Sequence, residues 1–126
     1  MHRAQLVSAI VEAGTGVALI VAPSIVALLL LGTDLSGAAV AVGRVAGIAL
    51  LSLALACWPG PAPVRSQQRA LLFYNTLVAL YLGYIGIEGQ WHGPLLWPAA
   101  GLHAVLTVLI AVSLVRGVKG AEVTAN

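Results

Sequence analysis

Four long apolar stretches, separated by short turn-forming breaks, dominate the hydropathy pattern of the chain. They cover roughly residues 4–22, 36–58, 67–88 and 94–115. Because an apolar helix of about 20 residues crosses the hydrocarbon core of a bilayer, each stretch predicts one membrane span. The pattern therefore predicts an all-α fold: a transmembrane four-helix bundle formed by a single domain over residues 1–126, with a polar tail at 116–126.

Proline and glycine mark the breaks between these stretches. Pro23 interrupts the first stretch and suits the first turn of a new helix. We therefore expect a short extra helix over 24–31 at the membrane edge, and a single kinked helix through Leu31 is the alternative. The motif "PGPAP" at 59–63 ends the second span, and Pro94 is well placed to begin the fourth.

The composition agrees with a membrane location. The chain is 60% apolar and only 8% charged, with a mean hydropathy of +1.02, whereas soluble domains are about 25% charged. The basic residues are scattered singly, which argues against a nucleic-acid surface, so the expected surroundings are the lipid bilayer. The N-terminus superficially resembles a signal peptide, but the apolar run is long and contains Glu12, so we expect it to be retained as a span.

The distribution of basic residues predicts the orientation. Apart from Arg44, all of the basic residues fall on one side of a four-span arrangement: Arg3, Arg65, Arg69, Arg116 and Lys119. Cytoplasmic loops and termini carry an excess of Lys and Arg. Both termini are therefore expected in the cytoplasm.

Two charged residues lie deep inside the predicted spans, away from the span ends: Glu12 and Arg44. A charge at the bilayer centre costs about 2.5–3.5 kcal/mol, so both should face the bundle interior. Counting 1.5 Å per residue from the helix ends places Glu12 level with Asn75, and Arg44 level with His103, in layers about 6 Å apart. An arginine side chain can bridge that distance, which predicts a Glu12–Arg44 pair. Whether the pair is structural or functional stays open.

Further residues extend this cluster into a polar seam and predict where helices pack. The seam adds hydroxyl groups on the same helix faces or along the third span: Thr15, Thr107, Tyr74 and Tyr81. Glycines that allow close helix packing are Gly43 and Gly47, which form a GxxxG motif, together with Gly14 and Gly16.

The candidate chemistry does not favour an enzyme, and no catalytic residue, cofactor or metal site is expected. His103 has no second intramembrane histidine to share a haem, and Cys57 is the only cysteine, which excludes a redox dithiol. Two hypotheses remain. The protein is an accessory, structural or binding component of a larger membrane complex, or it is a small-solute or proton-coupled transporter that acts as a homo-oligomer through the seam.

Three segments carry a resemblance: "EAGTGVALIVAPSIVALLLLG" at 12–32, "GRVAGIALLSLALACW" at 43–58 and "WPAAGLHAVLTVLIA" at 97–111. Their glycine, proline and arginine placement resembles small bacterial four-helix membrane proteins of DoxX-like layout. The resemblance implies a four-span fold in a bacterial inner membrane. It implies no activity for the polar residues.

Overall fold

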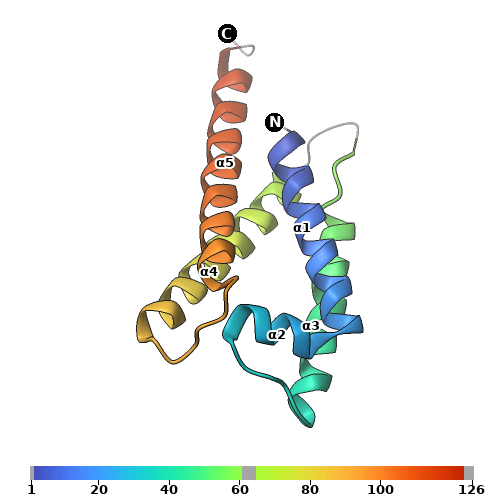
Figure 1. Ribbon diagram of the computed structural model, residues 1–126. Coiled ribbons are helices and arrows are strands. Elements are labelled where there is room, and N and C mark those ends of the chain that lie inside the picture. The colour runs from blue at the N-terminus through green and yellow to red at the C-terminus, as the bar shows by residue number, and fades with distance from the viewer. Residues whose placement is uncertain (1, 61–64, 124–126) are drawn as a thin grey trace.

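The computed structural model describes residues 2–60 and 65–123, and these are helices joined by short turns (Figure 1). The elements are α1 (His2–Val21), α2 (Pro23–Leu31), α3 (Ala38–Ala56), α4 (Arg65–Glu88) and α5 (Leu96–Val123). All except α2 are long and apolar enough to cross a membrane. The predicted fold class is confirmed: the protein is all-α, with four membrane-spanning helices and a short helix after the first span.

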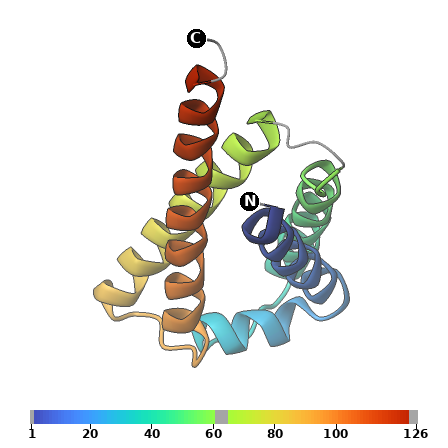
Figure 2. The same ribbon diagram turned by 90° about the horizontal axis from the view of Figure 1, so that it is seen from above.

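The long helices form two pairs rather than one closed bundle. Helix α1 packs along α3, and α4 packs along α5, whereas contacts between the pairs are few. The pairs diverge, and α2 joins them at the end opposite the start of α1 and the end of α5 (Figures 1 and 2). Helix α2 contacts α1, α3 and α5, so it holds the two pairs together at that end.

Two glycines set the close approach of α1 and α3. A Cβ atom added at Gly47 would lie 2.6 Å from the Gly16 carbonyl oxygen, and one at Gly16 would lie 2.8 Å from the Gly47 oxygen. Closer to the start of α3, a Cβ atom added at Gly43 would lie 3.0 Å from the Pro23 Cβ. The absence of side chains at these positions therefore brings the backbones together, as small residues do between membrane helices.

Local sequence signals begin and end α2. Ala22 has a non-helical backbone (φ −141°, ψ 65°), and Pro23 occupies the first turn, where its missing N–H needs no partner. Gly32 ends the helix in the left-handed conformation at φ 72°, and its N–H donates to the Leu28 carbonyl at 3.0 Å. This is a glycine C-cap, and it turns the chain towards α3.

The loop before α5 completes the hydrogen bonds at the end of α2. The backbone N–H of His92 donates to the Leu31 carbonyl at 3.1 Å, and that of Leu95 donates to the Leu29 carbonyl at 2.8 Å. Gly93 sits directly on the Leu30 backbone, where any Cβ would overlap it. These contacts satisfy carbonyls that a helix end leaves free, and they fasten α2 to the α4–α5 pair.

The last helix extends beyond the fourth predicted span. The tail predicted at 116–126 is polar in composition, and α5 continues through it as far as Val123. Residues 116–123 contain no proline that would interrupt the helix. Residues 124–126, and most of the predicted turn at 59–63, lie outside the described residues.

Candidate functional site: a cavity between the helix pairs

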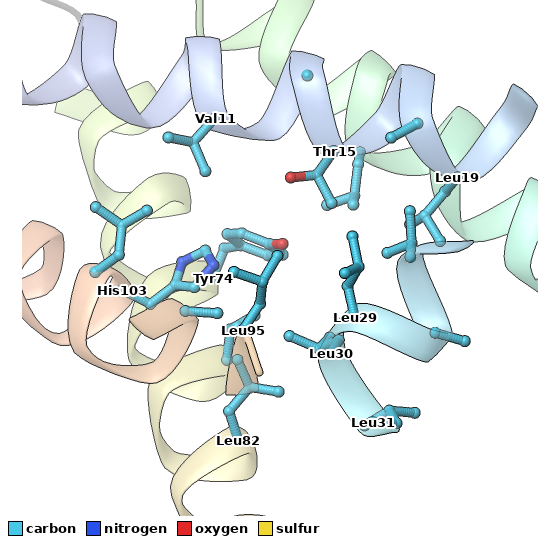
Figure 3. Close-up of a pocket in the computed structure, with 18 of the residues that line it drawn as sticks. Val11, Thr15, Leu19, Leu29, Leu30, Leu31, Tyr74, Leu82, Leu95 and His103 are labelled. Carbon is cyan, nitrogen blue, oxygen red and sulfur yellow. The ribbon is translucent and has the colours of Figure 1, made fainter. Parts of the chain in front are cut away.

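The divergence of the two helix pairs leaves a cavity of about 560 Å³, bounded by all five helices (Figure 3). Most of its lining is aliphatic, contributed by α1, α2, α4 and α5 and by the residues beside them. Three polar side chains also reach it: Thr15 from α1, Tyr74 from α4 and His103 from α5. The volume falls within the range of roughly 300–1,000 Å³ that is typical of small-molecule sites.

His103 is held by a buried chain of hydrogen bonds. Its Nδ1 lies 2.8 Å from Asn75 Oδ1, and Asn75 Nδ2 donates to the Ser8 hydroxyl at 2.9 Å and to the Leu71 carbonyl at 2.8 Å. The Leu71 carbonyl can only accept, so the amide nitrogen of Asn75 must face it. The amide oxygen therefore faces His103, and Nδ1 of the imidazole must carry the proton.

Tyr74 packs against this histidine. The Tyr74 and His103 rings meet edge to face, with centroids 5.9 Å apart and an interplanar angle of 79°. Glu12 is buried at 1% exposure, and no described residue hydrogen-bonds its Oε1. Its carboxyl group does not line the cavity.

A polar stripe on α1 leads from the N-terminal end of that helix to the cavity. It consists of Gln5, Ser8, Glu12 and Thr15, which follow the spacing of one helix face. The sequence analysis did not single out Gln5, which is 2% exposed and donates to the Cys57 carbonyl at 3.0 Å and to Gln67 Oε1 at 3.2 Å. Its spacing of three residues from Ser8 was the signal that could have revealed it.

The predicted Glu12–Arg44 pair is wrong. Arg44 is exposed, whereas Glu12 is only 1% exposed and its Oε1 has no hydrogen-bond partner among the described residues. Helix α3 packs mainly on α1 and has little contact with the other pair, so only one of its faces is covered. The prediction assumed a closed bundle in which every polar residue of a span turns inward.

The predicted depth layers are also corrected. Asn75 bonds directly to His103, although counting residues from the helix ends had placed them in separate layers. Helix α4 runs obliquely across α5 (Figure 2), so the rise along the helix overstates depth in the membrane.

The remaining predicted residues divide between the cavity and the outside. Tyr81 is 64% exposed and does not belong to the buried cluster. Thr107 donates to the His103 carbonyl of its own helix at 2.8 Å and does not line the cavity. Gly14 is exposed and packs against no helix, since an added Cβ would find nothing within 4 Å, but it does line the cavity.

The lining combines two kinds of contact. An aliphatic wall offers burial of apolar surface, and a few convergent polar groups can fix the orientation of a bound molecule. His103 Nε2 could bind a metal, but no group of three or more His, Cys, Asp and Glu side chains comes together in residues 2–60 and 65–123.

Comparisons with known proteins yield no relatives. No family model, curated protein or solved structure matches the chain. The DoxX-like resemblance therefore stays a prediction, and function must be argued from the cavity itself.

Proposed function

We propose that the protein is a binding component of the membrane, and that it holds a small, mostly apolar molecule in the cavity between its helix pairs. The observation that supports this most strongly is a 560 Å³ aliphatic space reached by Thr15, Tyr74 and His103. A buried scaffold of hydrogen bonds, rather than solvent, orients the histidine. Such preorganisation lowers the entropic cost of binding.

Native mass spectrometry of the protein, extracted gently from its own membrane, tests this proposal. The expected result is a protein peak that carries one additional small molecule and loses it at higher collision energy. A protein that carries no such molecule, and that also fails to take up added apolar probes, contradicts the proposal. The same spectrum reports whether other chains accompany it, which is what an accessory-subunit role requires.

Proton-coupled transport is a second candidate, and the polar stripe on α1 favours it. Gln5, Ser8 and Glu12 lie one above another and lead towards Thr15 at the cavity, and buried ionisable groups in membranes commonly mark proton or substrate paths. Under this hypothesis, Glu12→Gln abolishes solute-driven proton flux in proteoliposomes while the variant folds normally. Equal flux in the variant and the parent protein excludes it.

A further inference from the structure

We infer that the ligand of this cavity carries a hydrogen-bond donor, a hydroxyl group on an apolar body, and that this hydroxyl donates to Nε2 of His103. The inference rests on the proposed function, since it assumes that the cavity holds a ligand. It specifies the chemical class of that ligand: an apolar alcohol or phenol rather than a hydrocarbon, an ether or a carbonyl compound.

The hydrogen-bond chain behind His103 determines which imidazole nitrogen faces the ligand. Asn75 donates through Nδ2 to the Leu71 carbonyl, which fixes its amide orientation, and so Oδ1 accepts from Nδ1 of His103. In the neutral imidazole the other nitrogen, Nε2, is then a lone-pair acceptor. No described residue hydrogen-bonds Nε2, and His103 lines the cavity although only 7% of its surface is exposed.

The neighbouring polar groups are compatible with the same ligand chemistry. Tyr74 and Thr15 also line the cavity, and Thr15 Oγ points into it (Figure 3). A hydroxyl group can donate or accept, so neither residue excludes a donor on the ligand. His103 Nε2 can only accept, and a ligand without a donor would leave it unpaired.

A matched pair of probes separates donor recognition from simple burial. The probes are 2-naphthol and 2-methoxynaphthalene, which share an aromatic body. In the ether, a methyl group replaces the hydroxyl proton. Binding is measured by equilibrium dialysis of protein-loaded nanodiscs against empty nanodiscs. For each protein, the readout is the ratio of the dissociation constants of the two probes. The ratio in the parent protein is then divided by the ratio in His103→Leu, so that the different lipid partitioning of the two probes cancels.

The parent protein should favour 2-naphthol over its ether by roughly 2- to 12-fold more than His103→Leu does, the range of a single neutral hydrogen bond. The control Thr107→Val removes a hydroxyl that lies outside the cavity lining and bonds only a carbonyl of its own helix, so it should keep the parental ratio. Equal ratios in the parent and His103→Leu overturn the donor inference but leave the proposed function intact. A ratio that collapses only in Thr107→Val also overturns it. If neither probe binds above empty nanodiscs, the proposed function itself fails.

A measurement without a change at His103 covers the case in which His103→Leu does not fold. In a His2→Gln, His92→Gln background, His103 is the only histidine. Its imidazole ¹⁵N spectrum should show a proton on Nδ1 and none on Nε2. The Nε2 resonance should shift with 2-naphthol and stay unchanged with 2-methoxynaphthalene. A proton on Nε2, or equal shifts with both probes, overturns the inference.

Discussion

Replacing Gly47 with alanine should separate α1 from α3 and destabilise the protein. The added Cβ would lie 2.6 Å from the Gly16 carbonyl oxygen and 2.8 Å from the Leu19 Cβ. Ordinary contact begins at 3.4 Å, so the backbone of α1 must move away by 3.4 − 2.6 = 0.8 Å. Neither contact involves the flexible end of a long side chain, so a rotamer change cannot relieve the overlap.

The expected cost follows from two opposing effects. Overpacking of this kind costs about 1–3 kcal/mol, whereas alanine is favoured over glycine within a helix by about 1 kcal/mol. The net loss should therefore lie between about 0 and 2 kcal/mol. Gly14→Ala is the matched control on the same helix pair, because nothing lies within 4 Å of its added Cβ. It should retain the propensity gain alone, so the two variants should differ by roughly 1–3 kcal/mol.

Cys57 provides the assay. It is the only cysteine of the chain and is 2% exposed in the fold, so a maleimide labels it mainly in unfolded molecules. The fraction labelled across a denaturant series gives the free energy of unfolding for each variant. A Gly47→Ala protein as stable as Gly14→Ala would refute the close glycine packing of α1 and α3.

Three further predictions use the same readout. Arg44→Gln should leave the free energy of unfolding within about 0.5 kcal/mol of the parent, because Arg44 is exposed. A loss of several kcal/mol would instead indicate that Arg44 forms the ion pair with Glu12 that was predicted from the sequence. Burial raises the pKa of the Cys57 thiol, so the fold keeps it protonated: native labelling at neutral pH should be slower than that of an unfolded control, and stability should fall as the pH rises above the ordinary thiol pKa. Equal labelling rates, or stability that is independent of pH there, would contradict this. Asn75→Leu should lower the free energy of unfolding by about 1–3 kcal/mol, because it leaves the buried partners of Asn75 unsatisfied. Thr107→Val should cost less, because its hydroxyl bonds only a carbonyl of its own helix. Equal costs would show that the hydrogen bonds of Asn75 do not hold the site together.

The elements of this fold follow from local sequence because each signal acts within a few residues. Apolar stretches of span length predicted the four long helices, and Pro23 predicted the separate short helix that the structure has. Gly32 acts equally locally, since only its own backbone angle ends α2. Local signals are enough in the membrane because its hydrocarbon offers backbone groups no water partner, so an apolar span satisfies their hydrogen bonds by forming a helix.

The arrangement of the helices could not be predicted in the same way. The predicted Glu12–Arg44 pair assumed that the four long helices pack into one closed bundle, whereas the chain forms two diverging pairs. That divergence depends on long-range contacts, such as the bonds from the loop before α5 to the end of α2. No periodicity within one span encodes those contacts. The cavity exists because of them, so it was not foreseen, although Thr15, Tyr74 and His103 had each been singled out.

Ligand binding in the cavity is tested most directly by narrowing that cavity without disturbing the packing. Gly14→Phe adds a side chain at the cavity lining, where its Cβ meets nothing within 4 Å. Gly101→Phe adds the same side chain on α5 at a glycine equally free of contacts that does not line the cavity. Equilibrium dialysis of 2-naphthol in nanodiscs should show binding weakened by at least about tenfold, or ~1.4 kcal/mol, in Gly14→Phe and unchanged in Gly101→Phe. Equal binding to both variants and the parent would contradict the assignment of the cavity as the binding site.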